Sequence, residues 1–243
     1  MIIILTQCFP TKVGGIETLM YDIASNLSIK NDVKVLADQQ DAYKDLGYKK
    51  GDFPETENYQ TAFIFLGIYP NNFVIQESYA SLFTEMLTDG KNVYMEGGDT
   101  WAFDTNTSLH SMFGIDTQLS SDGSSDLESL IGIEDTFTEN LSFSYDGGNN
   151  YIDRLVPSSG YALLENASSG NVTAVAYENI LSNYKTIGAS HELGGLQGEF
   201  FDEYVDGILT FFDQGQDVIS ERPHWTAGDV NCDYVLDFLD IFW

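Results

Sequence analysis

The N-terminal part of the chain combines apolar runs with a helical repeat, as a strand-helix-strand unit does. Residues 2–5 are a continuous apolar run, as in a strand buried on both faces of a parallel sheet. After a loop with Gly14 and Gly15, apolar residues repeat at helical spacing from 16 to 27, and residues 32–37 predict a second strand. This stretch therefore predicts one β-loop-α-β unit.

The pattern begins again after a polar stretch. Residues 61–66 and 92–95 are strand-like apolar runs, and residues 76–87 between them place apolar side chains at helical spacing. Gly90 stands where it would end that helix. Strand, helix and strand in this order predict a right-handed parallel crossover, so the core begins as an open α/β sheet.

The later apolar segments are shorter and closer together. Turns rich in Gly, Asn and Ser separate them, which predicts added strands that are partly antiparallel. An amphipathic helix is expected to close this part of the chain. The expected strands are 141–145, 161–164, 173–177 and 184–189, and the helix covers 200–212.

Charge is unevenly distributed along the chain. Residues 1–50 contain six lysines and six acidic residues, so their formal charge is zero. The remainder holds four of the ten basic and 32 of the 38 acidic residues, and therefore the whole net charge of −28. This break predicts a junction near residues 38–55 between parts of different character.

The same charge restricts the partners and the location. A net charge of −28 repels phosphate backbones and the sequence has no basic stripe, so no nucleic acid is expected as a partner. Acidic surfaces are typical of secreted proteins, although intracellular halophile-like proteins share them. The apolar run Met1–Leu5 is too short for a signal-peptide core or a membrane span. Cys8 and Cys232 form no metal or disulfide motif.

The N-terminal loop carries a family motif. Residues 5–17, Leu-Thr-Gln-Cys-Phe-Pro-Thr-Lys-Val-Gly-Gly-Ile-Glu, closely resemble the opening of retaining glycosyltransferases built from two Rossmann-like domains. In that family the glycine loop, here Gly14 and Gly15, lets the backbone approach acceptor and donor at a helix N-terminus. Such enzymes also need a second domain with an E-x7-E pair and basic groups, and no such pair with neighbouring basic residues follows here.

The central segment resembles another family. Its layout is similar to class I glutamine amidotransferase-like domains, and the strings at 65–72, 94–101 and 186–195 resemble a module of large secreted bacterial proteins. This resemblance covers residues 45–215. It implies a flavodoxin-like α/β fold, an open sheet that is mostly parallel with added antiparallel strands. It also implies an extracellular or cell-surface location.

The amidotransferase chemistry can be compared residue by residue. The family needs a cysteine on a strained Gly-x-Cys-x-Gly turn and a later His-x-Glu pair that activates it. Residues 95–99 read Met-Glu-Gly-Gly-Asp at the turn, without a nucleophile, and His191 and Glu192 are adjacent instead of one residue apart. The sequence therefore predicts no catalytic residue from this family, and a degenerate hydrolase would have to pair Glu96 or Asp99 with His191.

A ligand cleft is the remaining prediction for the central segment. In open α/β sheets, sites form beyond the carboxyl ends of the strands. Aromatic rings beside carboxylates suit a carbohydrate or a cation, although the same residue types also serve turns and packing. The residues expected to gather there are Tyr69, Glu96, Asp99, Trp101, His191 and Glu192.

The C-terminal residues resemble the first repeat of a dockerin, with an EF-hand-like calcium loop. Residues 229–240 follow its D-x-N-x-D-x-x-x-D-x-x-D spacing. Position 6 of the loop is Tyr234 where Gly is usual, and the second repeat is missing, so calcium binding should be weak and cohesin docking is not expected. The predicted ligands are Asp229, Asn231, Asp233, the Val235 carbonyl, Asp237 and Asp240.

Together these patterns predict four parts: 1–38 glycosyltransferase-like, 45–215 amidotransferase-like, 216–227 linker and 228–243 truncated dockerin-like loop. The favoured function is a non-catalytic binding or assembly module of a secreted or cell-surface multidomain bacterial protein, with a carbohydrate or a protein as ligand. The alternative is a fragment of a nucleotide-sugar-dependent glycosyltransferase.

Overall fold

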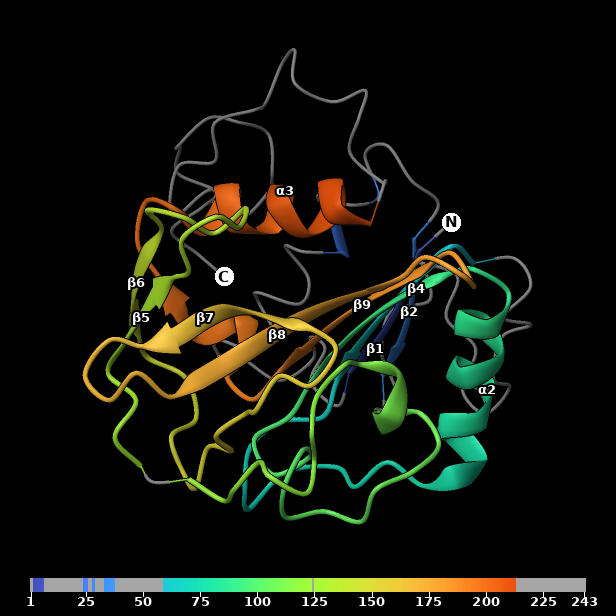
Figure 1. Ribbon diagram of the computed structural model, residues 1–243, viewed down its shortest axis with the longest axis horizontal. Helices are drawn as coiled ribbons and strands as arrows, with labels where there is room; N and C mark the ends of the chain where they lie inside the picture. The colour runs from blue at the N-terminus through green and yellow to red at the C-terminus, as the bar shows by residue number, and fades with distance from the viewer. Residues whose placement is uncertain are drawn as a thin grey trace, which may run out of the picture.

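The computed structural model describes residues 2–6, 24–25, 28, 33–37, 59–123 and 125–212 (Figure 1). Its strands form one sheet in the order β10-β6-β5-β7-β8-β9-β4-β3-β1-β2. The strands are β1 (Ile2–Thr6), β2 (Val33–Ala37), β3 (Thr61–Phe65), β4 (Asn92–Glu96), β5 (Ser129–Gly132), β6 (Ser142–Tyr145), β7 (Tyr161–Asn166), β8 (Val172–Asn179), β9 (Tyr184–Ala189) and β10 (Leu196–Gln197).

One half of the sheet is parallel. Strands β2, β1, β3, β4 and β9 lie side by side in that order and run in the same direction. All five residues of β3 and of β4 are buried, which explains why these strands read as continuous apolar runs. The strands predicted around 2–5, 61–66, 92–95 and 184–189 are confirmed.

The other half is antiparallel, and it shows that the predicted flavodoxin-like, mostly parallel fold is wrong. Five of the nine strand pairings among the described residues are antiparallel. The loops 167–171 and 180–183 are too short for a parallel crossover, which needs a dozen or more residues, so β7, β8 and β9 must pair as hairpins. Between β5 and β9 the fully described chain contains no helix to cover a face.

Two helices pack on opposite faces of the sheet. Helix α2 (Glu77–Thr88) buries Ala80, Phe83 and Met86 against the face that carries Ile64 of β3. Helix α3 (Phe201–Phe211) buries Tyr204 and Ile208 on the other face. Apolar residues at helical spacing predicted both helices, and the boundaries agree within two residues.

The sheet curls around α3. The ring of Tyr204 on α3 lies 5.8 Å from that of Phe143 on β6, while Phe212 at the helix end lies 6.3 Å from Phe63 on β3. One short helix therefore contacts strands from both halves of the sheet. Figure 1 shows β5 and β6 standing beside one end of α3, with β9 and β4 passing below it.

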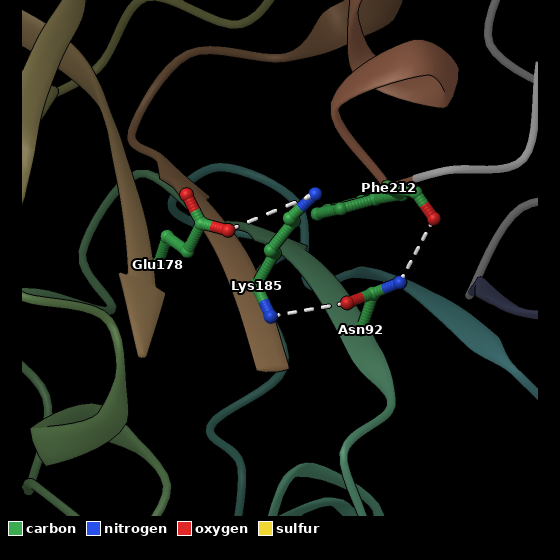
Figure 2. Close-up of polar contacts among 4 residues, drawn as sticks. All are labelled: Asn92, Glu178, Lys185 and Phe212. Atoms are coloured by element: carbon green, nitrogen blue, oxygen red, sulfur yellow. Dashed lines mark hydrogen bonds and ion pairs between the residues drawn. The ribbon is translucent and has the colours of Figure 1, made fainter. Parts of the chain in front are cut away.

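A buried asparagine holds the end of α3 on the parallel strands (Figure 2). The Asn92 side chain donates to the carbonyl of Phe212 at 3.0 Å and accepts the N–H of Lys185 at 3.0 Å. Lys185 Nζ lies 3.9 Å from a Glu178 carboxylate oxygen and 5.4 Å from the Phe211 ring centroid. Asn92 thus joins β4, β9 and the end of α3 with both ends of its amide.

Several predictions concern residues outside the described ranges. Gly14 and Gly15 of the glycosyltransferase-like loop, the linker 216–227 and the calcium loop 228–243 all fall there, and they stay predictions. Strand β1 pairs with β3, so the two described N-terminal strands continue the sheet of the central segment. In the part of the chain that the structure describes, no helix has the length and apolar character needed to cross a bilayer.

Candidate functional site

Three loops meet at the carboxyl ends of β3 and β4, where the sequence places most of its candidate residues. Gly98, after β4, donates its N–H to the carbonyl of Gly67, after β3, at 3.1 Å. Asp153, in the loop before β7, donates its N–H to the carbonyl of Gly98 at 2.9 Å. The Asn150 side chain reaches the carbonyl of Tyr69 at 3.2 Å. These bonds make the three loops one continuous surface, called here the loop edge.

The turn after β4 is tight, and it lacks the nucleophile of an amidotransferase. A Cβ on Gly98 would lie 2.7 Å from Ile68 Cδ1, and one on Gly97 would collide with the Thr100 side chain. Both positions therefore need glycine for space. The turn presents no cysteine or serine at the place where the family carries its reactive thiol.

Glu96, the last residue of β4, is a buried structural carboxyl. Its Oε2 accepts the phenolic O–H of Tyr94 at 2.7 Å and the N–H of Leu193 at 2.8 Å. Burial raises the pKa of Glu96 to about 8, because the charged form loses its hydration. At neutral pH this group is mostly protonated, and it ties β4 to the loop after β9.

Glu192 and Tyr145 extend the same network toward β6. The Glu192 carboxylate accepts the N–H of Gly148 at 2.6 Å, and the Tyr145 hydroxyl donates to the Gly148 carbonyl at 2.8 Å. The Tyr145 hydroxyl also accepts the N–H of Glu192 at 3.2 Å. Burial raises the pKa of Glu192 above its ordinary value. We call Tyr94, Glu96, Tyr145 and Glu192 the buried network.

His191 lies beside this network without joining its hydrogen bonds. The ring is fully buried, with Nδ1 at 3.2 Å from the Thr173 hydroxyl and Nε2 without a partner among the described residues. Burial lowers the pKa of His191 to about 4, so the ring is neutral at pH 7. It hydrogen-bonds neither Glu96 nor Asp99, the pairing that a degenerate hydrolase would require.

Trp101 belongs to the core beneath the loop edge. Its indole N–H donates to the carbonyl of Ala189 at 2.8 Å, and its ring packs edge-on against Phe113 with centroids 5.1 Å apart. The side chain is fully buried. Its backbone N–H donates to the carboxylate of Asp153 at 2.9 Å.

Three carboxylates converge where the turn after β4 meets the loop before β7. Asp99, Asp122 and Asp153 each place an oxygen within 4.8 Å of the other two, and we call them the aspartate cluster. Asp99 and Asp153 are buried, while Asp122 is exposed. Burial, followed by repulsion from neighbouring aspartates, raises the pKa of Asp153 to about 8 and that of Asp99 to about 6.

Two exposed tyrosines of the loop edge lie against each other, and Phe73 and Phe103 in the same loops are also exposed. Tyr69 is 50% exposed and Tyr151 is 53% exposed, and their rings meet edge to face with centroids 6.3 Å apart. Tyr151 has a φ of 56°, a left-handed conformation that costs a residue with a Cβ on the order of 1 kcal/mol. The surrounding loop therefore maintains this ring position against a local backbone preference.

The structure separates the six predicted cleft residues by exposure. All six lie at or just beyond the ends of β3, β4 and β9, but only Tyr69 is substantially exposed. Glu96, Asp99, Trp101, His191 and Glu192 are each at least 91% buried. Sequence reasoning missed Tyr151, Asp122 and Asp153. Asp122 lies in the connection between β4 and β5, and Tyr151 and Asp153 lie in that between β6 and β7; around these residues no periodic pattern indicates which side chains approach the strand ends.

No protein-family model and no curated protein matches the sequence. Solved structures match in fold. The N-terminal domain of mmIFT52 has a TM-score of 0.56 at 13% identity, covering 89% of this chain and 99% of that domain. A cytoplasmic protein of Salmonella typhimurium has a TM-score of 0.53 at 12% identity, covering 87% of this chain and 98% of its own.

A cold-adapted β-galactosidase from Rahnella sp. R3 also matches, with a TM-score of 0.55 at 11% identity. The match covers 88% of this chain but 31% of the enzyme, so the chain spans about a third of the length of that relative. At these identities the likeness establishes a shared fold alone. The mixed sheet is therefore similar to that of a domain found both as a part of larger proteins and by itself.

Proposed function

We propose that this chain is a non-catalytic binding module that takes a carbohydrate on the loop edge, over Tyr69 and Tyr151. The observation that carries the proposal is which side chains of this edge are buried and which are exposed to solvent. The groups with potential for acid-base chemistry, Glu96 and His191, are buried, whereas the exposed side chains include two aromatic rings beside amide groups.

Catalysis by the buried groups is disfavoured on two counts. Glu96 already accepts hydrogen bonds from Tyr94 and Leu193. His191 is neutral at pH 7 and has no surface exposure. A general acid or base must reach the substrate within hydrogen-bond distance, directly or through one water. Neither residue meets that requirement as it stands.

The chemistry of the exposed side favours a sugar. Aromatic rings supply flat apolar surface for the C–H face of a pyranose, and neighbouring amide and carboxylate groups bond its hydroxyls. The exposed Asn150 joins the backbones that carry the two rings, because its side chain binds the Tyr69 carbonyl and it precedes Tyr151 in sequence. The left-handed backbone at Tyr151 fixes one of the two rings.

Affinity electrophoresis in gels containing soluble galactan, xylan, mannan or β-glucan tests this proposal. Galactan is included because a part of a β-galactosidase has a similar fold. The chain should be retarded by at least one polymer, and the double variant Tyr69→Ala, Tyr151→Ala should migrate as in a gel without polymer. Tyr161→Ala is the matched control, since Tyr161 is a tyrosine on β7 that is 42% exposed. Unretarded wild-type protein, or equal retardation of the double variant, contradicts the proposal.

A further inference from the structure

The aspartate cluster brings carboxyl groups together without a compensating cation among the described residues. Within the described residues, none of Asp99, Asp122 and Asp153 forms an ion pair, and neither does the nearby Asp104. Asp104 donates its backbone N–H to the carbonyl of Asp99 at 2.8 Å, so it belongs to the same surroundings. Bringing like charges together in a partly buried place is unfavourable unless something neutralises them.

Asp153 is held in place and still has an unused oxygen. Its Oδ2 accepts the N–H groups of Trp101 at 2.9 Å and Ala102 at 2.8 Å, which fixes the carboxylate. The residue is 1% exposed, and its Oδ1 is buried without a hydrogen-bond partner among the described residues. A buried oxygen without a partner carries its desolvation cost uncompensated, so it favours a proton or a metal ion.

Asp104 repeats this feature nearby. Its Oδ2 is also buried and has no partner in the described part of the chain, although the Asn72 side chain hydrogen-bonds the same carboxyl group. The buried network offers a direct contrast, because donors meet Glu96 and Glu192 at 2.6 to 2.8 Å. Unsatisfied carboxylate oxygens therefore gather around the aspartate cluster.

The spacing of the three carboxylates fits one hard cation. Oxygens bound to calcium lie 2.3–2.6 Å from the ion, so two of them on opposite sides are up to about 5 Å apart. The corresponding limit for magnesium is about 4 Å, because its bonds are 2.0–2.1 Å. Oxygens within 4.8 Å of one another can all bind one calcium ion, and a purely carboxylate set suits calcium better than zinc.

We propose that Asp99, Asp122 and Asp153 bind one calcium ion at the loop edge. The ion would join the turn after β4 to the loops that carry Asp122 and Asp153. This site is separate from the predicted ligands at 229–240, and it does not depend on the carbohydrate proposal. It adds a calcium site to the central sheet itself.

Calorimetric titration of calcium into the full chain tests the site. The parent protein for the titration carries Asp229→Ala and Asp233→Ala, which disables the predicted C-terminal loop. We expect one calcium ion per chain in this parent and a rise in its thermal unfolding midpoint over the value in EDTA. Asp122→Asn should weaken the affinity at least about tenfold. Asp153→Asn should abolish binding, while its amide oxygen still accepts the N–H groups of Trp101 and Ala102.

Asp202→Asn, an exposed aspartate on α3, is the matched control and should bind calcium as the parent does. Circular dichroism and thermal unfolding in EDTA check that each variant folds. If Asp153→Asn fails to fold, Asp122→Asn still tests the site, because Asp122 is exposed. Absence of calcium heat in the parent would overturn the proposal. Unchanged affinity in folded Asp122→Asn, or equal affinity of the parent for magnesium, would do the same.

Discussion

The buried network and the aspartate cluster each contribute a residue next to the same glycine pair, Glu96 before it and Asp99 after it, and they differ in the hydrogen bonds that their carboxyl groups receive. Glu96 and Glu192 meet backbone N–H groups and a phenol at 2.6 to 2.8 Å. Asp153 Oδ2 accepts two backbone N–H groups, whereas its Oδ1 has no hydrogen-bond partner among the described residues. The fold thus supplies hydrogen-bond donors to the carboxyl groups of the first set, but it leaves this oxygen of the second set without one in the described part of the chain.

This difference separates structural acids from candidate ligand groups more clearly than burial does. Glu96 is 4% exposed and Asp153 is 1% exposed, so exposure alone would place them together. Hydrogen-bond satisfaction distinguishes them, because native proteins leave few buried polar atoms unpaired. The predictions below test whether removing a carboxyl group from each set has the effect that this distinction requires.

The largest expected effect is the pH dependence of stability that comes from Glu96. Its pKa is about 8 in the folded chain, against 4.5 as the ordinary value. The folded state therefore binds the proton more tightly, and the contribution is complete below about pH 4.5 and lost as the pH rises through 8. Glu96→Gln mimics the protonated form, so it should match wild type near pH 5 and exceed it by a few kcal/mol above pH 8.

Urea unfolding at pH 5, 7 and 9 measures this effect. Asp153 and Asp99 have pKa values shifted in the same direction, but both are present in wild type and in Glu96→Gln, so their contributions cancel in the difference. A constant difference in unfolding free energy across this range would show that Glu96 is not a protonated structural group.

A smaller loss is expected when the hydroxyl of Tyr145 is removed. Tyr145→Phe leaves the Gly148 carbonyl and the Glu192 N–H without their partner, at a cost of about 1–3 kcal/mol. Chemical denaturation at pH 7 gives the value. Tyr161→Phe is the control, because Tyr161 is 42% exposed on β7. Equal stability of Tyr145→Phe and wild type would mean that the buried network is not satisfied in the way described.

Local patterns predicted the elements well, and they failed on how the strands pair. Apolar runs located β3, β4 and β9, and helical spacing located α2 and α3, because burial on both faces or one face leaves that signature in sequence. The direction of pairing depends on loop length and on the distant partner. Short turns after 160 pointed to hairpins, and a family resemblance outweighed them in the mostly parallel prediction.

The candidate site was predicted only in part, for a similar reason. Tyr69, Glu96 and Asp99 directly follow or end strands, so the rule that sites form at carboxyl ends of strands locates them. Tyr151, Asp122 and Asp153 reach the same edge from two connections without periodicity, through contacts such as the Asp153 N–H bond to Gly98. Whether an oxygen such as Asp153 Oδ1 lacks a partner is a property of tertiary structure alone.

The aspartate cluster should not show the loss of stability that is expected for Tyr145→Phe in the buried network. In EDTA at pH 7, Asp153→Asn should leave stability unchanged or raise it by up to about 1 kcal/mol, because it keeps the acceptor for Trp101 and Ala102 and replaces a carboxyl group that is mostly protonated at this pH. Thermal and urea unfolding in EDTA measure it. A loss as large as that of Tyr145→Phe would place Asp153 among the structural acids and remove the contrast between the two sets.

The smallest effect is expected for Asp122, and it tests most directly whether this carboxylate already has a partner in the protein. Asp122 is exposed, so Asp122→Asn in EDTA should change the unfolding free energy by no more than about 0.5 kcal/mol, in the stabilising direction because repulsion falls. That gain should shrink as salt is raised, since exposed charges are screened. Urea unfolding at low and high sodium chloride measures both. Destabilisation in EDTA would mean that the Asp122 carboxylate already has a stabilising partner in the protein, and the cluster would then have no need of a cation.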